Sequence, residues 1–313
     1  MSHTSRTASP ITRGVTALVA AISLVAGVSA LPATATPPPP VNYVNLGDSY
    51  SAGWGAGAPE VNPNYSAPVC YGSGPDHVTL LSALMSVNLV GDFACAGATL
   101  APGASYPSIP DQIRVAVNKG ALTTSTGLVT LTGGGNDLGF VGLLEQCGAL
   151  KQSGQSCVTL FHNGAEAAPT VVTPLVARVA AQIRDAAENA RIAWLGYPHL
   201  FAVAGQPTTI LPGDGFLTND EAVALNEAAD ALNSSIKDGL KGVKNAQFAN
   251  VVPKFDGHEL GSSAPWITPL VLNPADPGYI FNLHPTATGY AEGYYPVAVR
   301  QVKPAQIPQA AKL

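Results

Sequence analysis

The sequence predicts an α/β fold in which five parallel strands form one sheet and helices cover both of its faces. Five short apolar runs alternate along the chain with four helical patterns. Strands that are apolar throughout are typical of a sheet buried on both faces. Strand and helix in repetition imply parallel strands joined by right-handed crossovers. No second linker, internal repeat or low-complexity block follows residue 41, so we expect residues 41–313 to form a single domain.

The predicted elements are short, and each is justified by its own pattern. The strands are the apolar runs VNYVNLG (41–47), SVNLVG (86–91), GLVTLTG (127–133), RIAWLGY (191–197) and AQFANVV (246–252). The helices carry apolar residues at helical spacing and cover residues 76–86, 110–120, 171–190 and 218–242. The last helix has the clearest start, because Thr218 stands three residues before Glu221 and forms a capping box.

Four Cys residues predict two disulfides formed in an oxidising compartment. Three pairings are possible, and we expect the local one, Cys70 with Cys95 and Cys147 with Cys157, in which each bond closes one contiguous loop. The second bond would staple residues 140–170, which we expect to be an irregular surface insertion. No CxxC or HExxH spacing occurs in the sequence, so no metal site is predicted.

The N-terminus has the pattern of a secretion signal, which predicts a secreted protein that could associate with the cell envelope. Arg6 and Arg13 form a basic region before an apolar stretch, which is followed by small residues. Cleavage could follow Ala30 or Ala35. An uncleaved membrane anchor is the alternative. We assign residues 1–35 to the signal and residues 36–40, TPPPP, to a stiff proline-rich lead.

The composition excludes several classes of protein. Hydrophobic residues make up 46% of the 313 residues, which is enough for a large core and argues against disorder. Without residues 1–35 the chain has 20 acidic and 13 basic residues, a net charge of −7. Because phosphate binding needs clustered Lys and Arg, we do not expect a nucleic-acid partner.

Residues able to catalyse acyl transfer are predicted to meet at one edge of the sheet. Ligands of open parallel sheets bind outside the carboxyl ends of the strands. Ser49, Gly97 and Asn136 follow the first three strands, and His284 lies in the long C-terminal segment. A neutral His can take the proton of a Ser nucleophile. The backbone N–H groups of Ser49 and Gly97 and the amide of Asn136 could bind the oxyanion.

Other interpretations of these motifs fit less well. A Gly-Asp-Ser tripeptide alone is commonly a turn, and GGGND alone is a glycine turn before a helix. A dinucleotide-binding GxGxxG pattern starting at Gly133 fails at Leu138, and no GKS or GKT is present. The nucleophile-elbow pattern GxSxG fails at Ser51. We expect Asp48 to fix the turn through local backbone hydrogen bonds, and His258 to be structural.

Four segments together resemble, in order, the conserved blocks of the SGNH or GDSL hydrolase family. They are NLGDSYSAG, CAGATL, TLTGGGNDLGF and NLHPTATGY, and FDGHELGSSAPWI and ALNEAADALNSSI are similar to its secreted actinobacterial branch. The resemblance implies a flavodoxin-like α/β/α sandwich and a cofactor-free serine ester hydrolase. It also implies that Ser49 is the nucleophile, that Ser49, Gly97 and Asn136 form the oxyanion hole, and that His284 is the base.

The sequence departs from the family pattern at Phe281, where the family usually has an Asp that orients the imidazole three residues later. We expect a backbone carbonyl at Phe281 to accept the Nδ1–H of His284, which would make a Ser-His dyad. The side chain of Asp276 or Asn282 could reach the ring instead, or the protein could be an inactive relative.

The expected function is therefore hydrolysis of carboxylic esters, with lipid or fatty-acyl esters first among the substrates. A phospholipase, a carbohydrate O-acetyl esterase, and a non-catalytic surface binding protein on the same scaffold are the alternatives. We expect a monomer that binds a small-molecule or lipid ester and has no stable membrane span after signal cleavage. The acyl pocket is predicted to contain Trp54, Tyr65, Leu143, Leu144 and Phe161.

Overall fold

A five-stranded parallel sheet organises the computed structural model, which describes residues 38–302 except 67–68, 104–105, 272 and 274. The order across the sheet is β4-β1-β5-β6-β7. The strands are β1 (Val41–Asn45), β4 (Val87–Asp92), β5 (Leu128–Leu131), β6 (Arg191–Leu195) and β7 (Ala246–Ala249). All five predicted strands and their parallel pairing are confirmed. The hairpin of β2 (Pro59–Val61) and β3 (Tyr71–Ser73) was not predicted.

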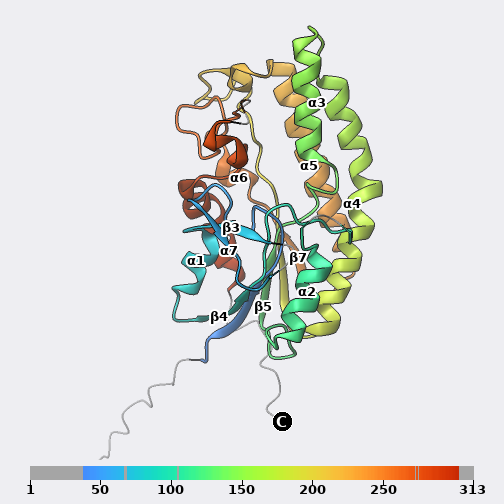
Figure 1. Cartoon of the computed structure of the whole chain (residues 1–313), viewed down its shortest axis with the longest axis vertical. Coiled ribbons are helices and arrows are strands. Elements are labelled where there is room, and N and C mark those ends of the chain that lie inside the picture. The colour runs from blue at the N-terminus through green and yellow to red at the C-terminus, as the bar shows by residue number, and fades with distance from the viewer. Residues whose placement is uncertain (1–37, 67–68, 104–105, 272, 274, 303–313) are drawn as a thin grey trace, which may run out of the picture. The chain divides into compact units, whose positions relative to one another are not determined.

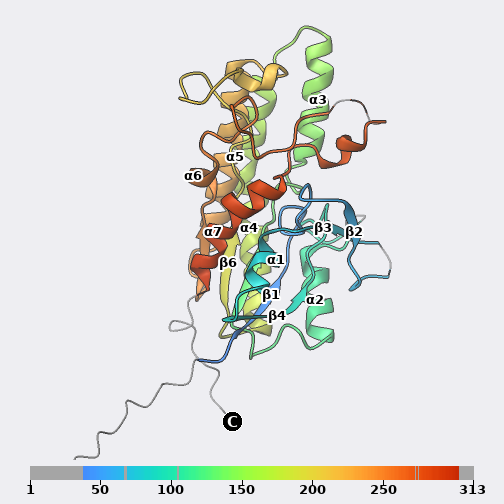
Figure 2. The same cartoon turned by 90° about the vertical axis from the view of Figure 1, so that its left-hand side faces the viewer.

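Helices cover the sheet on both sides, as expected for a three-layer sandwich. On one side lie α2 (Ile109–Asn118), α4 (Val158–Ala186) and α5 (Asn219–Gly239), and α3 (Phe140–Gln152) extends beside α4 and α5 (Figure 1). On the other side lie α1 (His77–Ser82), α6 (Val252–Phe255) and α7 (Tyr295–Ala298), the layer that faces the viewer in Figure 2. The large buried side chains, such as Trp194 and Phe93, pack between these layers and the sheet.

The prediction of an irregular insertion at residues 140–170 is wrong. This region contains α3 and the first part of α4, a helix of 29 residues that continues through Pro169 and Pro174. Two features concealed the helices in the sequence. Prolines inside a helix ordinarily end it, and α3 buries only Cys147, so it lacks the usual apolar stripe toward a core.

The ends of α3, α4 and α5 are fastened together. The capping box predicted at the start of α5 is present, and the Glu221 carboxylate accepts from the backbone N–H of Thr218 at 2.8 Å. The same carboxylate binds Lys151 Nζ at 2.6 Å and the N–H of Cys157 at 3.0 Å. The structure also joins Cys147 to Cys157, and Cys70 to Cys95, which is the expected pairing.

The predictions for the N-terminus concern a region that the structure describes little or not at all. The predicted secretion signal, residues 1–35, lies outside the described residues, as do residues 36 and 37 of the proline-rich lead. Within the described part of the chain, no helix is both long and apolar enough to cross a bilayer.

Candidate active site

Ser49 lies directly after β1 in a tight turn. The N–H of Asp48 bonds the Thr132 carbonyl at 3.2 Å, and the N–H groups of Ser51 and Ala52 bond the carbonyl of Asp48. Gly47 makes this turn possible, since its φ is +124° and a Cβ there would lie 2.5 Å from the Thr132 carbonyl oxygen. The Ser49 side chain is consequently held at the end of the strand, mostly buried at 8% exposure.

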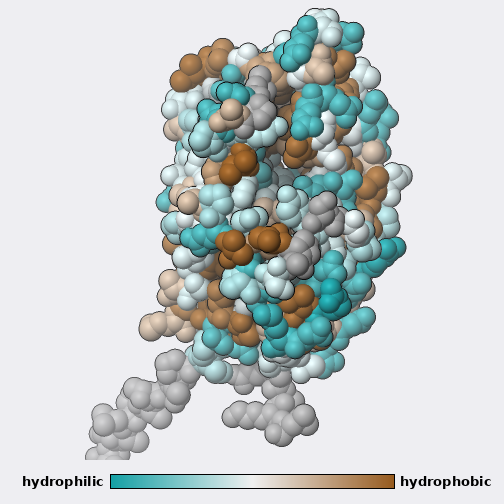
Figure 3. All heavy atoms as spheres, viewed as in Figure 1, coloured by the Kyte–Doolittle hydropathy of each residue, from teal (hydrophilic) through white to brown (hydrophobic). Residues whose placement is uncertain are grey.

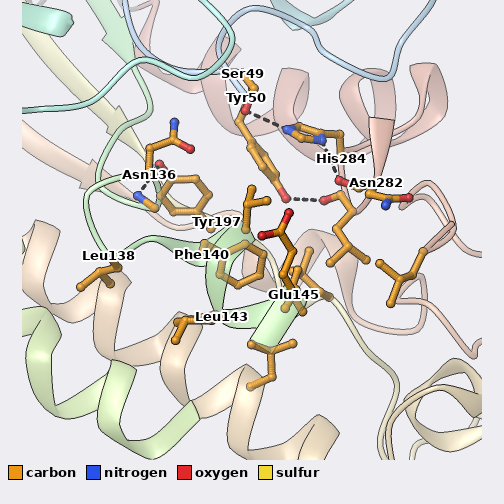
Figure 4. A pocket seen from close by; sticks show the side chains of 18 of the residues that line it. Ser49, Tyr50, Asn136, Leu138, Phe140, Leu143, Glu145, Tyr197, Asn282 and His284 are labelled. Atoms are coloured by element: carbon orange, nitrogen blue, oxygen red, sulfur yellow. Dashed lines mark hydrogen bonds between the residues drawn. The ribbon is translucent and has the colours of Figure 1, made fainter. Parts of the chain in front are cut away.

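The structure brings Ser49 and His284 into hydrogen-bonding contact across 235 residues of sequence. Ser49 Oγ lies 2.7 Å from His284 Nε2 (Figure 4). The other ring nitrogen, Nδ1, faces two backbone carbonyl oxygens, that of Asn282 at 2.8 Å and that of Phe281 at 3.2 Å. Because carbonyls only accept hydrogen bonds, we assign the proton to Nδ1. Nε2 then presents a lone pair to the Ser49 hydroxyl.

The carbonyl nearer to the ring is that of Asn282, not the expected one of Phe281. The Phe281 carbonyl also accepts from the Thr268 hydroxyl and from the His284 N–H. The Asn282 side chain pairs with the backbone of Val271. Asp276 caps its own turn, because its carboxylate accepts from the Gly278 N–H at 2.8 Å. Neither candidate side chain is therefore directed at the imidazole.

The segment that presents His284 is held from two sides. Thr268 accepts from the His284 N–H through its hydroxyl at 3.1 Å and donates its own N–H to the His284 carbonyl at 2.8 Å. On the other side, the Tyr50 hydroxyl donates to the Leu283 carbonyl at 2.5 Å. Leu283 has a φ of +60°, a left-handed conformation that is unfavourable for a bulky residue. These hydrogen bonds supply the support that such a backbone needs.

The residues predicted for the oxyanion hole line the same cavity as Ser49 and His284. The amide of Asn136 (Figure 4) donates to the Ala98 carbonyl at 2.8 Å, which fixes the orientation of the amide. The Asp137 carboxylate accepts from the N–H groups of Leu100 and Ala101, each at 2.9 Å. The loops after β4 and β5 are thereby tied to each other.

Asp48 does more than the local role expected of it. Its carboxylate accepts from the Tyr50 N–H at 3.0 Å, as expected, and also from the Thr132 hydroxyl and the Tyr197 hydroxyl, each at 2.5 Å. Burial raises the pKa of Asp48, and these hydrogen bonds oppose that rise. Tyr197 also accepts from the Gly135 N–H at 3.3 Å. Tyr197 lies two residues after the end of β6. The sequence pattern placed it inside the predicted strand 191–197, so the strand-end rule would have found it only with the shorter strand that the structure shows.

A cavity of about 1250 Å³ opens above Ser49 and His284 and continues along α3. The expected pocket residues Trp54, Leu143 and Leu144 line it. Tyr65 and Phe161 do not line the cavity, because both pack against the core. Four exposed side chains, Tyr71, Tyr106, Val141 and Ile280, also line the cavity. Figure 3, in the same view as Figure 1, shows a hollow on this face of the molecule with hydrophobic side chains on either side of it.

Two further predictions concern metal binding and His258. Among the described residues, no three His, Cys, Asp or Glu side chains are grouped closely enough to hold a metal ion. The His258 ring stacks on Trp266 with centroids 3.5 Å apart, and its Nδ1 contacts the Ala264 carbonyl at 2.7 Å. These contacts agree with a structural role for His258.

Comparison with known proteins identifies relatives over most of the chain. Residues 46–292 match the GDSL-like lipase/acylhydrolase family. Lipase 1 of Streptomyces coelicolor is 31% identical over 82% of this chain and 84% of its own. A crystal structure of an extracellular lipase from Streptomyces rimosus superposes with a TM-score of 0.66 at 27% identity, over 83% of this chain and 99% of its own. Phospholipase A1 from Streptomyces albidoflavus superposes with a TM-score of 0.65 at 29% identity, over 83% and 98%.

The imidazole of His284 should titrate at an unusually low pH. Burial lowers its pKa to about 4, although the carbonyls of Asn282 and Phe281 favour the protonated ring. We expect an NMR titration of the ring to have its midpoint near pH 4 rather than at the usual value of about 6.5. His284→Gln identifies the resonance by removing it. A midpoint at or above 6.5 would show that the ring is solvated or has a carboxylate partner.

Proposed function

Since the chain belongs to the GDSL-like lipase/acylhydrolase family, it is a serine ester hydrolase, and we propose that it cleaves fatty-acyl esters through an acyl intermediate on Ser49. One observation carries the mechanism: Ser49 Oγ lies 2.7 Å from a His284 Nε2 that is free to accept its proton. The position of this pair at a large, mainly apolar cavity supports an acyl chain as the bound group.

The proposed reaction has two halves. Ser49 Oγ attacks the ester carbonyl carbon while His284 Nε2 takes the hydroxyl proton. The tetrahedral oxyanion is stabilised by the N–H groups of Ser49 and Gly97 and by the Asn136 amide. His284 then gives its proton to the leaving alcohol, which breaks the ester C–O bond and leaves the acyl group on Ser49. A water molecule, deprotonated by His284, then attacks this acyl ester. The bond to Ser49 Oγ breaks, His284 returns the proton to Ser49 Oγ, and the carboxylic acid is released.

The dyad replaces a carboxylate by backbone dipoles. When His284 carries both protons, the carbonyl of Asn282 accepts from Nδ1–H, and that of Phe281 lies within reach. A carbonyl dipole stabilises an imidazolium less than a full negative charge does. The low pKa of His284 agrees with that arrangement, and it keeps the base neutral over a wide pH range. Orientation then depends on Thr268 and Tyr50.

The lining of the cavity favours fatty-acyl esters over the smaller substrates. An O-acetyl group or a small soluble ester would leave most of about 1250 Å³ unfilled. The exposed side chains Tyr71, Tyr106, Val141 and Ile280 suit a substrate that is itself apolar. One structural relative is a phospholipase A1, so phospholipids are the second candidate class.

We propose further that the protein acts outside the cell and as a monomer. Export is supported by the signal pattern in residues 1–35, by two disulfides, and by the extracellular lipase among its structural relatives. A monomer is sufficient for catalysis because Ser49, Gly97, Asn136 and His284 all come from one chain.

Replacing Ser49 with Ala should lower kcat for nitrophenyl butyrate by roughly 10⁴-fold or more, because the acyl acceptor is lost. Wild-type protein should react covalently with a fluorophosphonate probe at Ser49, and the variant should not. Circular dichroism would establish that the variant is folded. If the folded wild-type protein does not react, the acyl mechanism is wrong and a non-catalytic binding role is favoured.

Replacing Asp276 with Ala should change kcat by no more than about twofold. Its carboxylate caps the turn at Gly278 and does not orient the imidazole. The measurement is ester hydrolysis by purified variant and wild type at neutral pH. A loss of several orders of magnitude in a folded Asp276→Ala protein, comparable to the roughly 10⁴-fold loss when a triad Asp is removed, would overturn the dyad.

Tyr50→Phe should lower kcat about tenfold with little change in KM, because it removes the hydrogen bond to the Leu283 carbonyl and loosens the segment before His284. Tyr294→Phe is the matched control, since Tyr294 is also a buried Tyr that donates to a carbonyl, that of Gly196. The Tyr50 variant alone should also shift the NMR titration of His284. Equal effects of the two substitutions would assign Tyr50 a merely structural role.

A further inference from the structure

We propose that Gly148 determines which acyl chains this hydrolase accepts, by keeping the far part of the cavity open for chains longer than about ten carbon atoms. The inference rests on the proposed function, because it takes the cavity to be the acyl-binding site. It adds a residue that sets chain length and a class of substrate, long-chain fatty-acyl esters.

The cavity follows α3 along its length. Residues that line it occur from the first turn of the helix, at Phe140, to the last, at Gln152. Residues three and four positions apart lie on the same face of a helix. Leu144, Glu145, Lys151 and Gln152, which stand at these spacings on either side of Gly148, all line the cavity, as does Gly148 itself. A side chain at position 148 would therefore point into the cavity.

No local requirement explains a glycine at this position. Gly148 lies inside α3 and does not have a positive φ, so its backbone does not require glycine. A Cβ there would meet no atom within 4 Å, so close packing does not require it either. A glycine in a helix interior costs about 1 kcal/mol of stability relative to alanine. Because glycine has no side chain, this position leaves free volume in the cavity.

The length of α3 between the Ser49 end of the cavity and Gly148 determines how long an acyl chain must be to reach Gly148. Phe140 lies near the Ser49 end of the cavity, because its N–H donates to the Gly135 carbonyl at 3.2 Å and the Gly135 N–H donates to the Tyr197 hydroxyl. Leu143 lies further along α3 (Figure 4). Eight residues of helix separate Phe140 from Gly148, a rise of about 12 Å. Because an extended chain zigzags, each C–C bond of about 1.5 Å advances it by only about 1.3 Å, so a chain of roughly ten carbon atoms spans that distance. Shorter chains end before Gly148.

Gly142 provides a matched control on the same helix. It too lies inside α3 without a positive φ and is partly exposed, and a Cβ added to it would meet no atom within 4 Å. Unlike Gly148, it does not line the cavity. Leu at either position raises helix propensity by a similar amount, so effects on α3 itself are shared by the two variants.

The test compares Gly148→Leu and Gly142→Leu on nitrophenyl esters of butyrate, decanoate and palmitate. Gly148→Leu should lower kcat/KM for palmitate roughly tenfold or more by overfilling the cavity, and leave butyrate within about twofold. Gly142→Leu should leave the palmitate-to-butyrate ratio of the wild type unchanged. Gly148→Ala, which adds one methyl group, should give a smaller shift in the same direction and covers the case in which the Leu variant does not fold.

The outcomes separate the inference from the function on which it rests. A folded Gly148→Leu protein with the wild-type palmitate-to-butyrate ratio would overturn the role of Gly148 and leave the proposed function intact. A second series, acetate esters of alcohols of increasing length, would overturn the acyl assignment if only that series responded to Gly148→Leu. Absence of wild-type activity on all of these esters would instead contradict the proposed function.

Discussion

The buried carboxylate of Asp48 is the constraint on which the site depends. It accepts hydrogen bonds from the Tyr50 N–H, the Thr132 hydroxyl and the Tyr197 hydroxyl, which belong to the loops after β1, β5 and β6. A buried carboxylate without donors is costly, so these three strand ends must keep their positions. Tyr197 extends the network to the Gly135 N–H, in the loop that carries the Asn136 amide. One carboxylate thus aligns the loop that carries Ser49 with the loop that carries Asn136.

His284 does not follow a strand of the sheet but lies in an irregular segment of the chain. Several groups together therefore orient its ring. In a triad, one carboxylate both orients the ring and stabilises its charge. Here the Asn282 carbonyl accepts a hydrogen bond from Nδ1–H, and Thr268 and Tyr50 hold the backbone that positions this carbonyl. Each hydrogen bond is worth only about 1 kcal/mol. The ring is therefore held by a set of weak contacts that also maintain the left-handed conformation of Leu283.

The sequence was sufficient to predict the sheet and the residues that meet at its edge, because topology determines where the carboxyl ends of parallel strands meet. The sequence was insufficient to predict contacts made by segments outside helices and strands. The pairing of Thr268 with residues 281–284 follows no period, so the Asn282 carbonyl could not be distinguished from that of Phe281. The helices between residues 140 and 170 were missed for another reason, since the apolar side chains of α3 are divided between the cavity and the edge of the core, and only Cys147 is fully buried.

That orientation of α3 has an energetic consequence. A helix that lines a cavity forgoes part of the packing that stabilises most helices in proteins. Its C-terminal end is held instead by the Cys147–Cys157 bond and by Lys151, whose ammonium group reaches the Glu221 carboxylate at 2.6 Å. Glu221 is itself almost fully buried and caps α5, so the wall of the cavity is anchored to the body of the fold at that end. Anchoring α3 there leaves part of its apolar surface available to the cavity, where in the proposed function contacts with a bound acyl chain add to the packing of the helix.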